Sequence, residues 1–284
     1  MTALEEWCRC AQIEAWAGYI RDVLYMKFRV LKDLMQYQTL LQYLVVLDLQ
    51  LRYRRSFFGF LWTLLNPLLT MLVLWVVFSR FARIQESNYA LFLLSALMVW
   101  FFFQQSVERS LSIIVGNREL IINTHVPKSI FPVALVLSNF VNLLLFLAVY
   151  IVLALPTAHS LPWTALLLPI ALSMLLLLTF GATLLMSALT VFFQDFLHLT
   201  TVLLRILFYL TPILYSPNIF GPKLAYLIKF NPVYYPVQTT RDLLYTGTLP
   251  GPAEVGIGFG MALLVFMTGF VVFTSLEDRF VYYV

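Results

Sequence analysis

Three arginines close together are the residues whose type and spacing best suit a fixed chemical task. Arg52, Arg54 and Arg55, with Tyr53 among them, stand directly before an uncharged run from Ser56 to Ser79. At ~1.5 Å per residue in a helix, this run can cross a bilayer core of ~30 Å. An arginine at the bilayer centre costs at least ~2.5 kcal/mol, so the three arginines mark a membrane face, which we expect to be the cytoplasmic one. The task that suits them there is contact with anionic lipid head groups.

The other reactive side chains do not form a recognisable catalytic or metal site. Cys8 and Cys10 are the only cysteines, and a lone C-x-C pair is a poor metal site, so we expect no metal. No glycine-rich loop ending in Lys-Ser or Lys-Thr occurs, so nucleotide must bind elsewhere. The acidic residues near apolar runs are scattered, which disfavours a membrane enzyme such as a lipid glycosyltransferase or acyltransferase. These residues are Glu108, Asp195, Asp242, Glu254, Glu277 and Asp278.

The composition is that of an integral membrane protein. Of the 284 residues, 61% are hydrophobic and only 11% are charged, whereas soluble domains carry ~25% charged residues. The net charge of +4 would suggest nucleic acid in a soluble protein. Here the basic residues gather at a membrane edge, so we expect lipid and no nucleic acid as their partner.

The first 55 residues are too charged to span a membrane. Between Tyr19 and Tyr37 apolar residues recur at spacings of three and four, which predicts an amphipathic helix on the inner leaflet. A helix packed on a soluble partner would show the same pattern. The segment Leu40–Leu51 is more apolar and leads into the arginines, so we interpret it as an interfacial elbow.

The rest of the chain predicts an all-α membrane domain of six spans over residues 56–276, followed by a cytoplasmic tail, 277–284. The long stretch from Ser129 to Gln194 has no Asp, Glu, Lys or Arg and is right for two spans. With both termini inside, Lys and Arg are more numerous in the inner segments, as the positive-inside rule requires. The expected spans are 57–79, 90–115, 130–155, 163–193, 199–215 and 255–275.

Three features of the membrane domain call for comment. Arg205 lies within the fifth span and is expected either to snorkel to the inner face or to be buried against a partner. Between the fifth and sixth spans, Asn231-Pro232 and Pro236 interrupt an apolar segment, which predicts two short re-entrant or interfacial helices on the outer face. Gly256 and Gly260 form a small-xxx-small pair that hints at close helix contact.

The segment between the second and third spans contains a short helix. We expect Asn117 to cap it, Glu119 to lie in its first turn and Pro127 to end it, with Lys128 at the membrane face. Such a helix suits docking to a soluble partner, although a plain cytoplasmic hairpin explains the pattern equally well. Nearby, Glu108-Arg109 is either an ordinary head-group pair or a buried functional pair.

Four motifs taken together resemble a known family. The first is Arg52-Tyr53-Arg54 with Gly59, Trp62 and Pro67-Leu68; the second is Asn117, Leu120-Ile121, Pro127-Lys128 and Pro132. The third is Thr211-Pro212-Ile213 with Tyr215; the fourth is Asn231-Pro232, Tyr235, Arg241 and Gly247. In this order, over about residues 40–275, they resemble the membrane subunits of type-two ABC exporters, in the branch that exports O-antigen, capsule and teichoic-acid polysaccharides. The family often has Arg-Asp after the fourth span where this chain has Gln194-Asp195.

The resemblance implies a bacterial cell-membrane permease, not itself an enzyme. It implies a homodimer with two copies of a separate ATPase that binds ATP and magnesium, and a lipid-linked glycan moved from the cytoplasm to the outer face. The coupling element that meets the ATPase would lie around Asn117–His125 and run on to Lys128. Its residues are Asn117, Arg118, Glu119, Leu120, Ile121, His125, Pro127 and Lys128.

A polysaccharide path needs aromatic platforms and few fixed charges, and the chain is 16% aromatic. As a hypothesis, the path is lined by Phe57, Trp62, Phe208, Tyr209 and Tyr215, although lipid-facing packing would explain each of them. Arg52, Arg54 and Arg55 could meet the lipid pyrophosphate or could simply be a positive-inside anchor.

Other functions fit less well. A type-two ABC exporter of a drug or small lipid would share the fold, and only the aromatic content and the motifs of the polysaccharide branch argue against it. A secondary transporter would usually show paired intramembrane charges or inverted repeats, and neither is apparent.

Overall fold

The computed structural model describes residues 36–52, 59–81, 88–124, 126–157, 162–216 and 228–283. Within these ranges the chain forms helices and no strand. The expected amphipathic helix from Tyr19 lies almost wholly outside them, as do Tyr53, Arg54, Arg55 and Phe57 of the expected sites.

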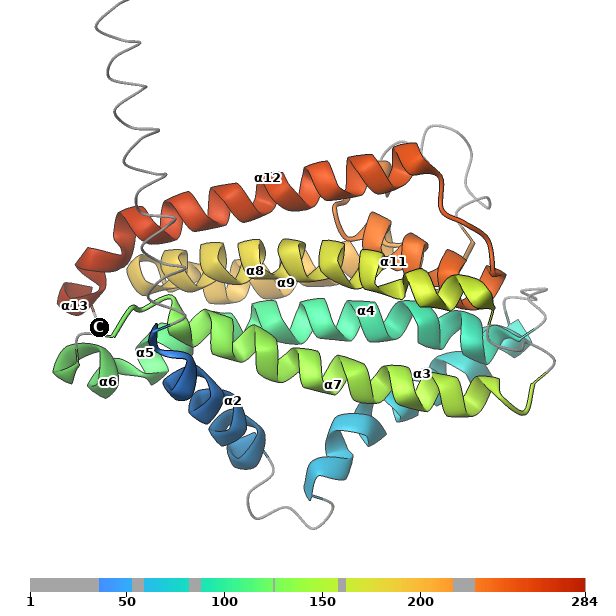
Figure 1. Ribbon diagram of the computed structural model, residues 1–284, viewed down its shortest axis with the longest axis horizontal. Helices are drawn as coiled ribbons and strands as arrows, with labels where there is room; N and C mark the ends of the chain where they lie inside the picture. The colour runs from blue at the N-terminus through green and yellow to red at the C-terminus, as the bar shows by residue number, and fades with distance from the viewer. Residues whose placement is uncertain are drawn as a thin grey trace, which may run out of the picture.

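Four helical stretches are long and apolar enough to cross a membrane. They are Tyr89–Ser110, Ile130–Ala154, Trp163–Phe192 and Pro252–Tyr283. They contain α4 (Tyr89–Ser110), α7 (Ile130–Ala154), a 3-10 turn (Trp163–Leu167) with α8 (Leu168–Phe192), and α12 (Pro252–Leu276) with α13 (Phe280–Tyr283). In Figure 1 these long helices run side by side along the length of the molecule. The chain is therefore an all-helical, multi-pass membrane protein.

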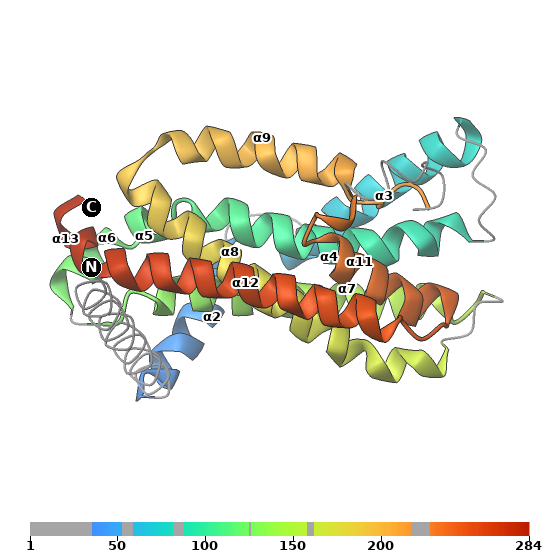
Figure 2. The same ribbon diagram turned by 90° about the horizontal axis from the view of Figure 1, so that it is seen from above.

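Two shorter helices occupy the expected first and fifth spans. Helix α3 (Trp62–Phe81) follows the 3-10 turn Gly59–Leu61 and continues through Pro67. Helix α9 (Asp195–Leu210) ends five residues before the expected Tyr215, because Thr211 is extended and Pro212 cannot continue the helix. Seen from above, α9 lies at one edge of the bundle (Figure 2).

The expected second span is also shorter than predicted, since α4 ends at Ser110 rather than Val115. A separate turn, α5 (Ile113–Gly116), takes up the remaining residues. Helix α4 is the centre of the bundle: most of its residues are buried, including Trp100, which is 1% exposed.

Helices α8 and α12 are packed backbone to backbone through glycines. A Cβ atom added at Gly269 would lie 2.0 Å from the carbonyl oxygen of Gly181. One at Gly258 would lie 2.3 Å from the sulfur of Met174. Gly256 and Gly260 make no such contact within the described part of the chain, because a Cβ at either would meet nothing within 4 Å. Both lie on the opposite side of α12 from the contact.

The segment between the fifth and sixth spans contains one described helix, α11 (Tyr234–Arg241), which continues as a π-helical turn (Asp242–Thr246). Gly247 ends this turn with φ 69°, a left-handed conformation that glycine adopts without strain. The position of α11, after Asn231-Pro232, agrees with the second of the two short helices expected there. The first falls mostly outside the described residues.

Candidate functional site

A small helical hairpin projects from the end of the bundle where α4 passes to α7. It consists of α5 and α6 (Arg118–Asn123), joined at Asn117. Asn117 was expected to cap α6, but its side chain makes no capping hydrogen bond; its Nδ2 donates to the Ile113 carbonyl at 2.7 Å. The amide therefore satisfies a carbonyl at the end of α5, where a donor is needed.

The expected end of this short helix was also wrong. Helix α6 stops at Asn123, and the next residue, Thr124, is extended, well before Pro127. Pro127 instead opens the turn into α7, accepting a hydrogen bond from the Ile130 N–H at 3.1 Å. Glu119 lies in the first turn of α6, as predicted. His125 is outside the described residues.

The hairpin is anchored on one side and open on the other. Ile114 and Ile121 are 1% and 4% exposed and belong to an apolar cluster with Phe131, Phe273 and Phe280. The opposite side exposes Arg118, Glu119, Leu120 and Ile122, with Leu120 at 44% and Ile122 at 47%. The hairpin is therefore seated firmly in the bundle while it presents a mixed apolar and charged surface outward.

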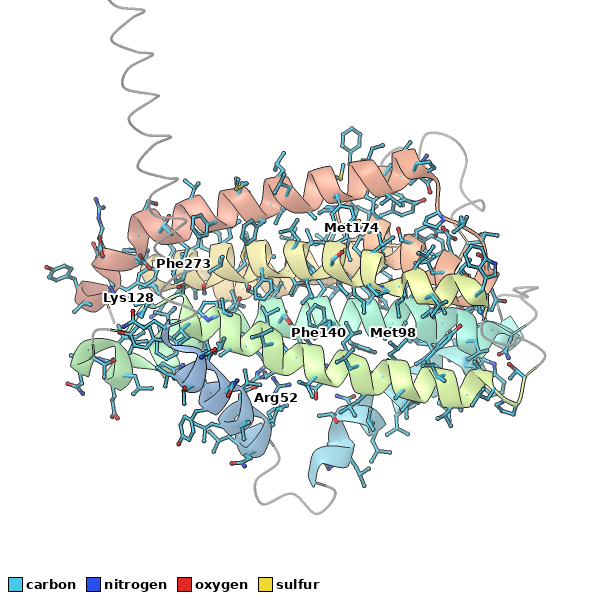
Figure 3. The ribbon with its side chains drawn as sticks, viewed as in Figure 1. Arg52, Met98, Lys128, Phe140, Met174 and Phe273 are labelled. Carbon is cyan, nitrogen blue, oxygen red and sulfur yellow. The ribbon has the colours of Figure 1, made fainter. Side chains whose placement is uncertain are left out.

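The C-terminal segment packs at the same end of the bundle. The Lys128 ammonium donates to the Glu277 carbonyl at 2.6 Å. Phe280 is fully buried, with its ring 5.3 Å from that of Phe273 and 6.0 Å from that of Phe192. Figure 3 shows Lys128 and Phe273 at this end of the molecule. These contacts fix the base of the hairpin against α12.

A polar cluster joins helix α2 (Gln38–Arg52) to the bundle. Asp48 accepts two hydrogen bonds from Arg52, at 3.0 and 2.5 Å, and both of its carboxylate oxygens bond to Arg109 of α4. From α7, the hydroxyl of Ser138 also bonds to Asp48, and the side-chain amide oxygen Oδ1 of Asn139 accepts from Arg52 at 2.7 Å. We call these five residues the α2 cluster.

The α2 cluster is largely shielded from solvent. The side chains of Arg52, Asp48 and Arg109 are 11%, 21% and 36% exposed. Burial alone would raise the pKa of Asp48, but hydrogen bonds from Arg109 and Ser138 and the charges of Arg52 and Arg109 hold it below its usual range. The cluster is thus an ionised contact between three helices.

Three residues that were considered for contact with lipid head groups, Arg52, Glu108 and Arg109, have side-chain partners within the protein. Arg52 points into the α2 cluster and not simply toward lipid (Figure 3). Arg109 also joins the cluster, whereas Glu108 accepts a hydrogen bond from Gln104 at 2.9 Å. Glu108 and Arg109 were expected as one pair, either at the head groups or buried; instead the half-buried Arg109 pairs with Asp48.

Three of the five expected path aromatics lie together at the end of α9. The rings of Phe208 and Tyr209 are 5.3 Å apart, and the Tyr215 hydroxyl donates to the Tyr209 carbonyl at 2.8 Å. Phe208 also packs edge-on against Trp100 of α4, at 5.4 Å. Trp62 begins α3 and is 41% exposed.

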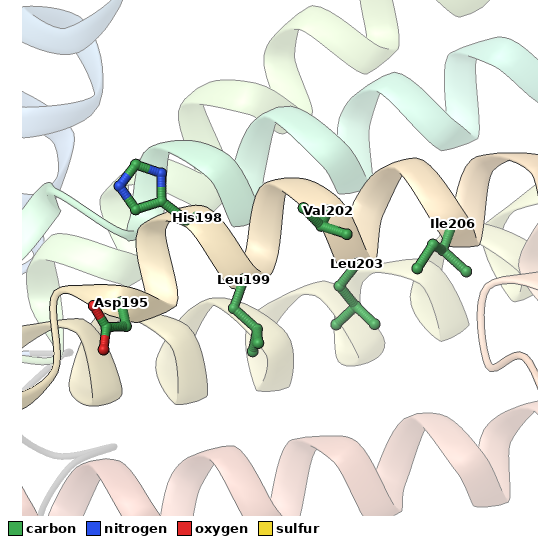
Figure 4. A pocket seen from close by; sticks show the side chains of 6 residues that line it. All are labelled: Asp195, His198, Leu199, Val202, Leu203 and Ile206. Carbon is green, nitrogen blue, oxygen red and sulfur yellow. The ribbon is translucent and has the colours of Figure 1, made fainter.

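Helix α9 has one face that the described residues leave uncovered. Its apolar residues border a shallow groove of about 560 Å³ (Figure 4). The groove is lined by Asp195, His198, Leu199, Val202, Leu203 and Ile206. Arg205 is exposed on the chain, not buried within it.

The expected outer residues make hydrogen bonds between neighbouring segments of the chain. Asn231 is 2% exposed, and its Nδ2 donates to Thr211 at 2.7 Å. Arg241 is also 2% exposed; it donates to the Ile213 carbonyl at 3.1 Å and lies 3.9 Å from the centre of the Phe92 ring. The Tyr235 hydroxyl donates to the Lys229 carbonyl at 3.0 Å. Pro232, next to Asn231, is half-buried.

The hydrogen bonds of Asn231 to Thr211 and of Arg241 to Ile213 hold the segment after α9 against α11. Beside Arg241, the pKa of Asp242 is raised to about 6, chiefly by burial and further by Glu254, against the opposing effects of the Gln238 hydrogen bond and Arg241.

The sequence model of the family described as "ABC-2 type transporter" matches residues 39–245, from α2 to the π-helical turn. The chain belongs to the ABC-2 type transporter family. It is 30% identical over 235 residues to "O-antigen export system permease protein RfbA" of Klebsiella pneumoniae, covering 82% of this chain and 90% of that protein. It is 30% identical over 254 residues to the protein of the same name from Myxococcus xanthus, covering 89% and 98%.

The family assignment confirms the resemblance drawn from the four motifs. The matched range of the ABC-2 type transporter includes the hairpin, the α2 cluster, α9 and α11. Sequence reasoning singled out Arg52 but missed Asp48, Ser138 and Asn139 as its partners. The available signal was the pair Ser138-Asn139, which with Asn142 stands in a largely apolar span, where polar side chains need partners.

Proposed function

We propose that this chain is the permease subunit of an exporter that moves a lipid-linked O-antigen-type polysaccharide from the cytoplasmic to the outer face of the bacterial cell membrane. The names of its relatives support the substrate class. Two copies of the chain form the conduit, and two copies of a separate ATPase, which bind ATP and magnesium, drive it.

The observation that carries this function is the hairpin. A surface that exposes Leu120 and Ile122 while Ile114 and Ile121 are locked in the bundle is suited to receive force from a partner and pass it on. A chain that hydrolysed ATP by itself would need no such surface. The ATPase therefore docks on α6, at the cytoplasmic end, in a topology of six spans with both termini inside.

The apolar faces of α3 and α9 supply the homodimer contact. Leu69, Leu72, Val73 and Val76 on α3 are each more than 40% exposed. The same holds for Leu199, Val202 and Ile206 on α9. In this arrangement Phe57, Trp62, Phe208, Tyr209 and Tyr215 provide stacking surfaces for sugar rings, and Arg54 and Arg55 meet the lipid pyrophosphate.

Transport by the reconstituted complex tests this function. The chain and its ATPase are placed in vesicles with a radiolabelled lipid-linked glycan on the outer leaflet, in the orientation that exposes α6 to added ATP. We expect ATP-dependent protection of the glycan from an added glycosidase, and no protection with the chain alone. ATP hydrolysis by the purified chain alone would overturn the proposal.

A further inference from the structure

Helix α2 packs along α7 and shares an apolar cluster with the hairpin. Its first turns, with Leu40, Leu41 and Leu44, pack against the cluster that contains Ile114 and Ile121. Its last turn holds Asp48 and Arg52 in the α2 cluster, and α3 is the next long helix in the chain. Helix α2 therefore lies against the cluster that seats the hairpin at its start and precedes α3 at its end.

A cavity separates part of α2 from the hairpin. It has a volume of about 180 Å³, lies between α2, α5 and α7, and is lined by Leu44, Asp48, Leu51 and Asn117 among others. No residue of α2 is fully buried. The apolar contacts of α2 are thus loose, whereas the α2 cluster fixes its other end by charge-assisted hydrogen bonds, which have a defined geometry.

One buried side chain of α7, about one turn beyond Asn139, has no hydrogen-bond partner among the described residues. Asn142 is 5% exposed, and neither its Nδ2 nor its Oδ1 makes a hydrogen bond to any described residue. Asn142 follows Ser138 by four residues and Asn139 by three. It therefore lies about one turn beyond both of them on the same side of α7. An unpaired buried amide is costly, and a second state in which it is paired would account for it.

We propose that Asp48 and Arg52 form a joint that passes the movement of the hairpin to α3, and that in the driven state Arg52 exchanges Asn139 for Asn142, one turn along α7. The inference rests on the proposed function, since it names the positioning residues of that transport cycle. Ion-paired elements with two discrete positions are a known way to carry movement between sites.

The test measures glycan moved per ATP hydrolysed in the reconstituted complex. Asn142→Leu removes the unpaired amide, so the resting chain should unfold at an equal or higher temperature while glycan per ATP falls about 5-fold or more. A merely structural role for Asn142 would not separate these two readouts. Unchanged glycan per ATP would overturn the exchange.

Asp48→Asn tests the joint itself. ATPase binding and hydrolysis should stay near the wild-type level, whereas glycan per ATP falls about 5-fold or more. The double variant Asp48→Asn with Arg109→Gln restores the net charge of the cluster without the bridge to α4, so it should remain defective. Recovery in the double variant would show that only charge balance matters and would overturn the joint.

Two further outcomes are decisive. If Asp48→Asn does not fold, Arg109→Lys keeps the charge but loses the two-point contact with Asp48, and a normal glycan yield per ATP in that variant would contradict the proposal. If the wild-type complex moves no glycan with ATP, the proposed function fails. If the wild-type complex moves glycan with ATP and all variants move as much glycan per ATP, only the proposed joint fails.

Discussion

Arg109 on α4 binds both carboxylate oxygens of Asp48 on α2, a residue 61 positions earlier in the chain. The same carboxylate holds Arg52, which reaches Ser138 and Asn139 of α7. A helix at the edge of the membrane domain is thereby fixed to two central helices through one ionised side chain. Removing such a carboxylate leaves arginines without their counter-charge, which is costly in a shielded site.

The glycine contact between α8 and α12 predicts a strong stability effect. In Gly269→Ala the new methyl group would meet the Gly181 carbonyl oxygen, so the two helices must separate. Overpacking of this kind typically costs about 1–3 kcal/mol. The expected result is a lower unfolding temperature of the detergent-solubilised chain.

Gly260→Ala on the same helix is the matched control, because a Cβ there meets nothing within 4 Å. It should unfold at or slightly above the wild-type temperature, since alanine favours the helix. Equal destabilisation by both substitutions would contradict the packing described for α8 and α12.

The environment of Asp242 predicts a pH-dependent contribution to stability. Its pKa is raised from 3.8 to about 6 in the folded chain, so the folded state binds more protons than the unfolded state between these values. The contribution of Asp242 to folding stability therefore declines as pH rises through this window. Asp242→Asn should stabilise the chain at pH 7, by roughly 1 kcal/mol after allowance for solvent screening, and should have little effect at pH 4.

Unfolding temperatures of the wild type and Asp242→Asn, measured at both pH values in one detergent, check this prediction. A variant that is destabilised at pH 7, or a difference that does not shrink toward pH 4, would show that the Asp242 carboxylate is well accommodated in its ionised form.

The aromatic residues of α9 carry a prediction for transport. Tyr209→Ala removes a ring that is 65% exposed and contributes little to packing, so the chain should fold normally. If successive sugar rings stack on it, glycan export in the reconstituted complex should fall several-fold, while ATPase binding stays unchanged. Tyr282→Ala, at an exposed position near the C-terminus, is the control for general loss of an aromatic side chain. Undiminished export in Tyr209→Ala would count against this residue as part of the path.

The exposed side of the hairpin carries a prediction for binding. Leu120→Asp places a charge where an apolar contact with the ATPase is proposed, and truncation of a central contact residue can cost about 2 kcal/mol or more. The expected result is a Kd for the ATPase that rises at least tenfold, with an unchanged unfolding temperature of the chain. Leu249→Asp, at a residue 57% exposed in the segment before α12 and outside the spans, should leave the Kd unchanged. Equal effects of the two substitutions would remove α6 as the docking site.

The sequence predicted the elements set by long-range composition. Apolar runs located the four long helices α4, α7, α8 and α12, because the bilayer demands length and apolar character of a spanning helix. The positions of Glu119 in α6 and of a short helix after Pro232 also followed from local signals. What the sequence could not predict depended on three-dimensional neighbours.

The expectations for the glycine pair on α12 and for Arg52 illustrate this difference. The spacing of Gly256 and Gly260 suits helix contact, but which side of α12 meets α8 is decided by the register of packing, and Gly258 and Gly269 lie on that side. Arg52 was expected at the lipid head groups because charge favours the membrane edge. A carboxylate one helical turn before it, and polar side chains on α7, give it partners inside the protein instead.

The central claim, that a separate ATPase drives this chain through the hairpin, is tested most directly by cross-linking. Leu120→Cys is introduced in a chain whose Cys8 and Cys10 are replaced by serine, and a bifunctional maleimide reagent is added to membranes that contain the ATPase. We expect a covalent product between the new thiol at position 120 and the ATPase, formed only when the reagent can reach the cytoplasmic side. Labelling of that position solely from the outer side of intact cells, with no ATPase product, would contradict it.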